Sequence, residues 1–408
     1  MTDSTNRLYM RVKQKRKGVR EQDMLDLDNL ARQVLENCSI SDSRHAGLYS
    51  VCGLALRLRD LYKWEKGLDP WIEMDSSVIL NWIGEKEENW DQLEEKEFNK
   101  ITILDKTYDP FDALGINEVL EPHGFLYGAG YVHSLKPSFL LAVLEEKRLI
   151  DGYPVYILGK ELARDLLTMP ALSQNDRILI RKEAAKLFLW DLIFFIKNSG
   201  RGALRFALES YGVKEQDSKA LRRNLARISD AETETYVYHE LGEIRDTVFD
   251  RHIWRDINAT FPHTPIELLA RVVKDLLADT NEHGRLRHIV RQQKEASLAL
   301  YAAFLDGLRK ELFPELKEAF QEFTETHNWQ VIEQAISRGY TRAKNYAEMM
   351  SRIYSEGKQK NDMKWVEVEM ETRLLNPLGL GRAEGRETAS NKHFTEEEDN
   401  GNHIDQSI

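Results

Sequence analysis

The sequence of 408 residues predicts a mainly helical protein: an N-terminal α+β part with a small antiparallel sheet, followed by a C-terminal helical bundle. Two observations lead to this prediction. Apolar residues recur at helical spacing in the first quarter of the chain and again after Gly159. Between these stretches, short apolar runs are separated by turn sequences such as Lys136-Pro137-Ser138 and Asp151-Gly152, a pattern typical of antiparallel strands.

Two helices are expected at the start of the fold. The first covers about residues 24–36 and is followed by a short loop at 37–42. Ser41 or Asp42 would cap a second, long helix that reaches Glu65, because short polar side chains accept hydrogen bonds from the first free backbone N–H groups. The expected buried stripe of this helix consists of Leu48, Val51, Cys52, Ala55, Leu56 and Tyr62.

The predicted sheet has three short strands, at residues 125–132, 139–145 and 155–158. A helix at 76–93 precedes the sheet, and another at 115–120 lies beside it. Strand is expected nowhere else in the chain.

Nearly all of the chain after Gly159 has the spacing of helices. Prolines at three positions fall near predicted helix starts, where the missing N–H costs nothing. The expected helices cover about residues 160–168, 181–198, 202–211, 217–227, 231–256, 265–279, 286–312, 315–325, 329–337 and 342–356.

The charge is distributed unevenly. The chain has a net charge of −11, residues 1–20 carry +6 and residues 378–408 carry −4, so the remainder carries −11 − 6 + 4 = −13. An acidic body repels phosphate backbones, so nucleic-acid binding is expected only through the basic residues at 7–20.

Composition divides the chain into four parts. The polar termini lack the apolar residues that a packed core requires. The predicted parts are a basic flexible arm at 1–23, an α+β domain at 24–170, a helical domain at 171–375 and a disordered acidic tail at 376–408.

Several protein classes are disfavoured by the sequence. Cys38 and Cys52 are too few for a disulfide framework, which fits a reducing compartment. The most apolar run, 187–196, is short and contains Asp191, so we expect no membrane span and a cytoplasmic protein. Phosphate-binding loops, dinucleotide fingerprints, nucleophile elbows and paired C-x-x-C motifs are absent.

The first candidate cluster is Cys38, Asp42, His45 and Cys52. Cys38 would be a nucleophile or ligand, with His45 as its base or co-ligand. Asp42 beside His45 would otherwise be a helix-capping carboxylate near an imidazole. His45 and Cys52 would lie about 10.5 Å apart along a helix, too far to share one metal ion. The alternative is that this cluster is part of the core, with Cys52 buried as a small apolar side chain.

The second candidate cluster is the segment His239-Glu240-Leu241-Gly242-Glu243. His239 and Glu243 are one helical turn apart and could ligate the same metal ion. The segment is similar to the H-E-x-x-H motif of zinc peptidases, with Glu240 in the position of the catalytic base. However, Glu243 stands where that motif has its second histidine, and this departure puts the chemistry in doubt.

Asp279 and His283 extend the second cluster. They flank the expected end of the helix at 265–279, and an antiparallel packing of the two helices would bring them to His239 and Glu243. These four side chains would bind a divalent metal such as zinc, iron or manganese. The alternative is a solvated face of ion pairs with helix-capping groups.

Four segments of the chain resemble an uncharacterised bacterial family of conserved hypothetical proteins. They are Cys38–His45, Cys52–Arg59, Gly159–Leu166 and His239–Glu243, and the likeness covers most of residues 24–340. The resemblance implies no known activity, cofactor or catalytic residue.

Three functions remain open at this point. The first is an interaction or regulatory protein with an unidentified protein partner. The second is a metal-binding protein or a metal-dependent enzyme that uses the His and carboxylate cluster. The third is a nucleic-acid-associated protein that uses its basic arm.

Overall fold

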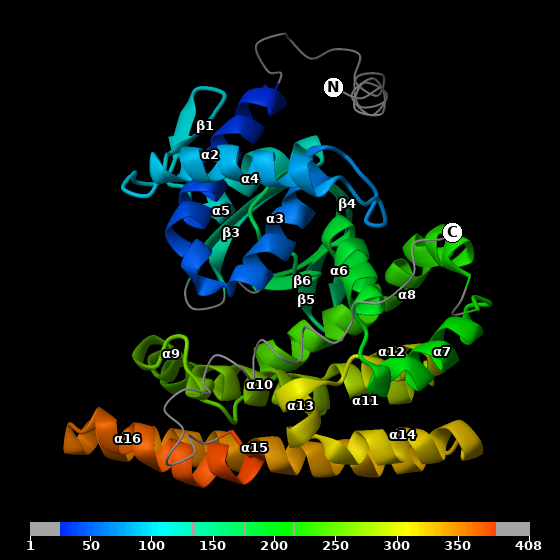
Figure 1. Cartoon of the computed structure of the whole chain (residues 1–408). Helices are drawn as coiled ribbons and strands as arrows, with labels where there is room; N and C mark the ends of the chain where they lie inside the picture. The colour runs from blue at the N-terminus through cyan, green and yellow to red at the C-terminus, as the bar shows by residue number, and fades with distance from the viewer. Residues whose placement is uncertain (1–24, 133–135, 175–176, 215–216, 381–408) are drawn as a thin grey trace.

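The computed structural model describes residues 25–132, 136–174, 177–214 and 217–380. In these residues an N-terminal region of helices around a sheet lies above a C-terminal region made of helices (Figure 1). The mainly helical fold, with strands in the N-terminal region, is as predicted. The predicted basic arm and residues 381–408 of the predicted tail lie outside the described residues.

The first helix is longer than predicted. Helix α2 covers Leu27–His45, and the side chain of Asp26 caps it by accepting from the N–H of Asn29. The expected loop at 37–42 and the expected caps Ser41 and Asp42 are therefore wrong, because these residues lie inside α2. Their polar side chains find partners in the rest of the fold, so tertiary contacts outweigh the local preference for a cap.

The second helix, α3 (Val51–Glu65), begins after a 3-10 turn at Ala46–Leu48, and Ser50 caps it. The predicted buried stripe is wrong over the first half of this helix. Val51 is 87% exposed and Cys52 is also exposed. The buried residues lie in the second half instead, and they are Leu58, Asp60, Leu61, Tyr62 and Lys63. Asp60 and Lys63 are charged, so the spacing of apolar residues could not identify this buried face.

A hairpin and a five-stranded sheet make up the β structure. The hairpin pairs β1 (Ile101–Ile103) with β2 (Lys106–Tyr108) and was not predicted. The sheet has the order β3-β4-β5-β7-β6. Its strands are β3 (Phe125–Val132), β4 (Lys136–Ile150), β5 (Tyr153–Arg164), β6 (Ala171–Gln174) and β7 (Arg177–Arg181). Strands β3, β4 and β5 are antiparallel neighbours, as predicted, and β3 has the predicted bounds.

The sheet differs from the prediction at its far edge. Strand β5 pairs with β7 in parallel, with Val155 opposite Ile178. The helix expected at 160–168 is wrong because β5 continues to Arg164, and the all-helical part begins at Lys182 rather than at residue 171. The charges that suggested a solvated helix are buried here, since Glu161 and Arg164 are each 2% exposed.

Helices cover both faces of the sheet. Helices α2 and α5 (Ala113–Leu120) pack on one face, where Leu30 and Ile116 contact the core around Phe139. Helix α8 (Ser218–Arg245) packs on the other face, where Val237 and Leu241 meet the side chains of β5 and β7. Helix α4 (Ser76–Asp91) packs against α2 and α3.

The C-terminal region contains eleven α-helices in the described residues. They are α6 (Lys182–Phe194), α7 (Arg201–Ser210), α8 (Ser218–Arg245), α9 (Arg251–Thr260), α10 (Pro265–Thr280), α11 (Arg285–Arg291), α12 (Glu295–Ala303), α13 (Gly307–Leu312), α14 (Pro314–Thr326), α15 (Trp329–Lys360) and α16 (Met363–Met370). No helix in the described ranges is long and apolar enough to cross a membrane.

Helix boundaries in this region differ from the prediction in three places. Helix α8 joins the predicted helix at 217–227 to most of the next one. The predicted helix at 286–312 is divided by Gln293 and Gly307, which both have positive φ. The predicted break near Gly339 is absent, because α15 passes through it. A Cβ there would lie 2.4 Å from the ring of Phe313, so this glycine allows close packing rather than ending a helix.

Candidate functional site

Asp42 lies inside the N-terminal region, where it meets Lys136 at the start of β4. The Nζ atom of Lys136 is 2.9 Å from Oδ1 of Asp42 and 3.1 Å from Oδ2 of Asp165. The three side chains are almost completely buried. Backbone N–H groups of Leu166 and Leu167 donate to the two carboxylates. One buried lysine therefore ties α2 and β4 to the segment that follows β5.

The two carboxylates differ in their affinity for protons. Burial raises the pKa of Asp42 to about 6, against the attraction of Lys136. Burial also disfavours the charged form of Asp165, but the positive charges of Lys136 and Arg181 outweigh it and hold the pKa of Asp165 below its usual range. Asp165 is therefore the permanent partner of Lys136, whereas Asp42 takes up a proton in mildly acidic solution.

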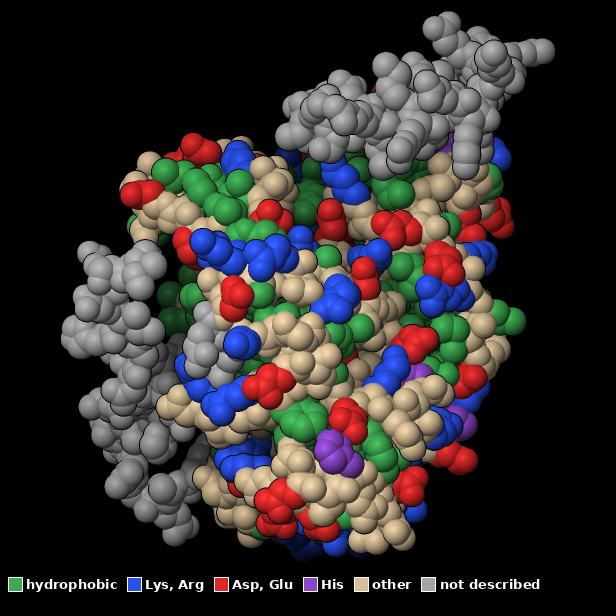
Figure 2. Space-filling model, turned by 90° about the vertical axis from the view of Figure 1, so that its right-hand side faces the viewer, with side chains coloured by type: hydrophobic (Ala, Val, Ile, Leu, Met, Phe, Trp, Pro, Cys, Tyr) green, Lys and Arg blue, Asp and Glu red, His purple; other side chains and the backbone are tan. Residues whose placement is uncertain are grey.

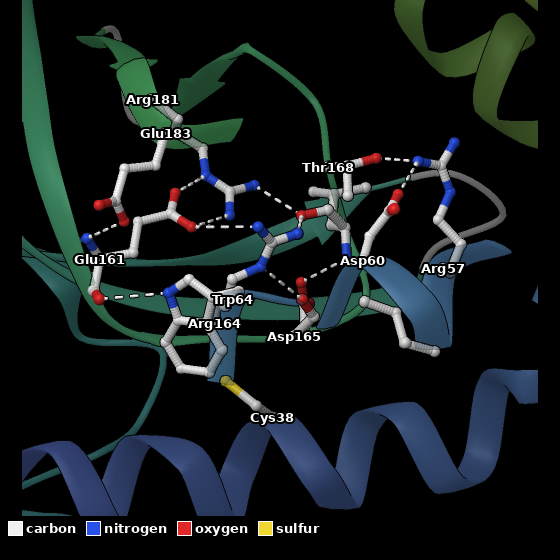
Figure 3. Close-up of polar contacts among 12 residues, drawn as sticks. Cys38, Arg57, Asp60, Trp64, Glu161, Arg164, Asp165, Thr168, Arg181 and Glu183 are labelled. Carbon is white, nitrogen blue, oxygen red and sulfur yellow. Dashed lines mark hydrogen bonds and ion pairs between the residues drawn. The ribbon is translucent and has the colours of Figure 1, made fainter. Parts of the chain in front are cut away.

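Two arginines continue this buried network (Figure 3). Arg181 of β7 pairs with both oxygens of Glu161, at 2.6 and 3.0 Å, and Nη1 of Arg164 lies 3.5 Å from the same carboxylate. Both guanidinium groups also donate to the backbone oxygen of Leu167. With Lys136, Asp42 and Asp165, three positive and three negative side chains are buried together, so their charges balance.

Cys38 is close to this network but does not have the properties of a nucleophile. Its Sγ lies 3.3 Å from the backbone oxygen of Phe139, to which the thiol donates. Burial and the negative charges of Asp165 and Asp42 raise the pKa of the Cys38 thiol well above its usual value, so it stays protonated. His45 donates from Nδ1 to the backbone oxygen of Ser41 at 2.8 Å, and burial lowers its pKa. The structure does not bring His45 to the Cys38 thiol as its base.

A cavity of about 800 Å³ opens beside the network. Its walls come from α2, α3, α4, β5 and α6. The indole N–H of Trp64 on α3 donates to the backbone oxygen of Glu161 at 3.3 Å, which ties two of these walls together (Figure 3). The charged lining residues are Lys63, Lys66, Lys86, Lys160, Arg164 and Lys186, together with Asp42, Glu65, Asp69, Glu161 and Glu183.

Glu183 lies in the first turn of α6 and lines the cavity. Its Oε2 accepts a hydrogen bond from the backbone N–H of Glu161 at 2.9 Å. Partial removal from water and the negative charge of Glu161 raise the pKa of Glu183, against this hydrogen bond.

A second ion-pair group joins α3 to α6. Arg59 lies 3.0 Å from Asp60 on its own helix and 2.8 Å from Asp191 on α6. Burial and the charge of Asp60 raise the pKa of Asp191 to about 7. The first helix of the C-terminal region is thus tied by charged groups to the helix that forms one wall of the cavity.

The second candidate cluster lies where α8 crosses α10. His239 Nδ1 is 2.7 Å from Oδ1 of Asp279, and the hydroxyl of Tyr301 donates to Oδ2 at 2.8 Å. Burial lowers the pKa of His239, but the charge of Asp279 outweighs it and raises this pKa to about 9. The pKa of Asp279 falls to about 2, since His239 and nearby arginines outweigh its burial. The pair is therefore an imidazolium and a carboxylate at neutral pH.

The other two proposed metal ligands have different partners. Glu243 pairs with Lys274, and His283 accepts a hydrogen bond from Arg245 at 2.8 Å. Among the residues that the structure describes, no three His, Cys, Asp or Glu side chains form a group that could hold a metal ion. Helices α8 and α10 are in contact through His239 with Asp279 and Glu243 with Lys274, but this geometry does not support the metal hypothesis.

Gly242 gives the same segment a structural role. A Cβ at this position would lie 2.0 Å from the backbone oxygen of Ala278. The side-chain amide of Asn281 donates to the backbone oxygen of Gly242 at 2.8 Å. The glycine therefore lets the two helices approach closely enough for His239 to reach Asp279.

Glu240 faces the sheet rather than α10. It is 4% exposed and accepts a hydrogen bond from Ser173 of β6. Burial and the charge of Glu243 raise the pKa of Glu240 to about 7. Burial in this contact keeps Glu240 away from water, so its proposed role as a catalytic base gains no support from the geometry.

The His239 pair predicts a loss of stability in alkaline solution. The folded pKa of about 9 lies above the ordinary value of 6.5, so this contribution is complete below pH 6.5 and is lost as the pH rises through 9. We expect the free energy of unfolding to fall by roughly 2–3 kcal/mol between pH 7 and pH 10 through this group. Urea unfolding at both pH values measures the change, and His239→Gln should remove it. An equal loss in the variant would assign the effect to other groups.

Two family models match the chain. The models of the N-terminal and C-terminal domains of a family of unknown function (DUF6866) match residues 29–181 and 186–373. The chain belongs to this family. The family is uncharacterised, as the resemblance implied. No curated protein and no solved structure matches the chain.

The two DUF6866 domains meet where β7 passes into α6. Helix α6 starts at Lys182, and its residues Glu183, Lys186 and Leu187 line the cavity. The cavity is therefore enclosed by side chains from both domains of the family. Pockets at such junctions are frequent binding sites.

Sequence reasoning missed most of the buried network. Lys136, Glu161, Arg164, Asp165 and Arg181 were not singled out, because charged residues suggest exposed positions. A signal was present in the Gly159–Leu166 segment, where Glu161, Arg164 and Asp165 interrupt an apolar run within a few residues. Their distant partners could not be identified from the sequence alone.

Proposed function

We propose that the protein binds a small, polar, negatively charged molecule in the cavity between its two DUF6866 domains. The observation that carries this proposal is the lining of the cavity, to which six Lys and Arg residues contribute from both domains. The volume of about 800 Å³ falls in the range of sites for small molecules. The role is regulatory rather than catalytic, because the buried titratable groups beside the cavity are paired with one another.

The charge balance of the lining favours an anion. Five acidic residues also line the cavity. Two of them form ion pairs with cations that do not line it, Asp42 with Lys136 and Glu161 with Arg181. Arg164 belongs to the same balanced network, so three acidic side chains are left against five positive ones. An anion entering the cavity meets an excess of positive charge.

The lysines at the mouth of the cavity can change partners easily. Lys86 lies 3.0 Å from Glu65, and Lys186 lies 3.3 Å from Asp69, which is half exposed. Ion pairs of this kind contribute little net stability. A phosphate or carboxylate on a ligand can replace these acidic partners with little cost.

Binding at this place would couple the two domains. Lys63 of α3 is 2% exposed and donates to the backbone oxygen of Pro70, so it holds the loop that closes one side of the cavity. Lys186 on α6 approaches the same loop through Asp69. A ligand held by Lys63 and Lys186 would therefore favour one arrangement of α3 relative to α6, which is how a ligand shifts a conformational equilibrium.

Thermal unfolding of the full chain tests the proposal. Inorganic phosphate, citrate and adenosine monophosphate at millimolar concentration are the probes, with glucose as an uncharged comparison. At least one anion is expected to raise the melting temperature, because a ligand that binds only the folded state stabilises it by about 2.7 kcal/mol at a hundred times its Kd. Glucose is expected to have no effect.

Two lysines on α6 provide a matched pair of variants. Lys186→Gln removes a lining charge and should abolish the shift. Lys182→Gln removes a charge one turn earlier, where Lys182 pairs with Glu145 and Asp230 outside this cavity, and should leave the shift intact. Equal shifts in both variants, or no shift with any anion, would contradict the proposal.

A further inference from the structure

The amino-terminal part of α8 carries a strongly basic surface. It consists of four residues of the helix, Lys219, Arg222, Arg223 and Arg227, together with Lys214, which precedes the helix, and all five are exposed. We call this set the α8 basic surface. Residues 210–229 contain five Lys or Arg and two Asp or Glu, a local charge of +3 in a chain whose net charge is −11.

The basic residues occupy one face of the helix. Six of the first ten positions of α8 are exposed, and four of them are basic, the other two being Ser218 and Ala226. Lys219, Arg223 and Arg227 follow one another at intervals of four residues, so they form a row about 12 Å long. Such a row presents positive charge along a line rather than at one point.

Within the part of the chain that the structure describes, three cations of the α8 basic surface are not paired with a carboxylate. They are Lys219, Arg222 and Arg223. Elsewhere on the surface exposed cations are commonly paired, as Lys358 is with Asp256 at 2.6 Å. Arg227 is held in place by the ring and backbone oxygen of Tyr211, so its guanidinium lies against a partly buried aromatic residue.

Figure 2 looks at the side of the molecule that carries α7 and the amino-terminal part of α8 in Figure 1, and Lys and Arg side chains recur across the middle of this face, with Asp and Glu side chains between them. The α8 basic surface is separate from the cavity, because none of the lining residues of the cavity belongs to it. Binding at the α8 basic surface therefore does not depend on a ligand in the cavity.

We propose that the α8 basic surface binds the phosphate backbone of a nucleic acid. Three of its five cations are arginines, whose planar guanidinium groups pair with phosphate through two hydrogen bonds. A straight row of exposed cations is an arrangement that can follow a phosphate backbone. The surface lies in the body of the protein, where the net charge had argued against such binding.

Fluorescence anisotropy with the full chain tests the inference. The probe is a labelled single-stranded DNA oligonucleotide, titrated at low and at moderate salt. Binding is expected to weaken steeply with salt, as counterion release requires. The variant R222Q/R223Q should lower the affinity roughly tenfold at low salt and reduce the salt slope by about 1–2, because two phosphate contacts are lost.

A matched control removes the same charge elsewhere. R338Q/R352Q takes two exposed arginines from α15, at the bottom of Figure 1, and should keep the affinity within about twofold of the wild type. Absence of binding at low salt would overturn the inference. So would equal losses in the two double variants, or an unchanged affinity in R222Q/R223Q, which would assign binding to overall charge or to another segment. Competition by polyglutamate as effective as that by unlabelled DNA would show instead a surface for acidic proteins.

Discussion

Replacing Lys136 with methionine is expected to destabilise the protein by about 3–5 kcal/mol, because it leaves Asp42 and Asp165 buried without their positive partner. Methionine fills a similar volume, so the loss reports on charge rather than on a cavity. A reduction of this size corresponds to a fall in melting temperature of about 2–4 °C per kcal/mol for a domain of 150–250 residues. Urea unfolding followed by tryptophan fluorescence measures it.

Lys147 supplies the control for this experiment. It lies on the same strand, is 52% exposed and pairs with Glu121 at 2.9 Å. Lys147→Met is expected to cost less than about 1 kcal/mol, since exposed ion pairs contribute little. The triple variant Lys136→Met, Asp42→Asn and Asp165→Asn should recover a large part of the loss, because it removes the unpaired charges as well. Equal losses for the two single lysine variants would show that the buried network does not depend on its lysine.

The general architecture could be predicted from the sequence because it depends on local patterns. Apolar spacing located most of the helices, and the run Phe125–Val132 had the composition of a buried strand. Two kinds of information were missing. The parallel pairing of β5 with β7 joins segments about twenty residues apart, and no local pattern specifies it. The path of α2 through residues 37–42 depends on partners about a hundred residues away, such as Pro137 for Ser41.

The candidate sites also depend on partners that are distant in the sequence. The sequence pointed to Asp42, His239 and Asp279, which all lie in polar clusters, with Asp42 and Asp279 buried and His239 partly buried. It also suggested a metal because His239 and Glu243 share a helix face. Spacing along a helix cannot show that Lys274 reaches Glu243, or that Tyr301 completes the pair of His239 and Asp279. The chemistry of each cluster is decided by cations and hydroxyls from distant segments.

The second large effect is expected at Gly242. In Gly242→Ala the new Cβ would lie 2.0 Å from the oxygen and 2.8 Å from the carbon of the Ala278 carbonyl. Both are backbone atoms in α10, so no side chain can turn aside to relieve the clash, and the helices must separate. We expect a loss of about 3 kcal/mol or more, at the upper end of the range for overpacking. Separation would also lengthen the bond between His239 and Asp279, so the variant should lose much of the alkaline dependence predicted for the wild type.

Gly84 allows the steric effect to be separated from the ordinary effect of alanine in a helix. It lies in the interior of α4, and a Cβ there would meet no atom within 4 Å. Gly84→Ala is therefore expected to stabilise the protein by about 0.5–1 kcal/mol, because alanine has less conformational freedom to lose on folding. Urea unfolding of the two variants at pH 7 should thus give changes of opposite sign. If Gly242→Ala is also neutral or stabilising, the close crossing of α8 and α10 does not exist in solution, and the imidazolium pair of His239 loses its structural basis.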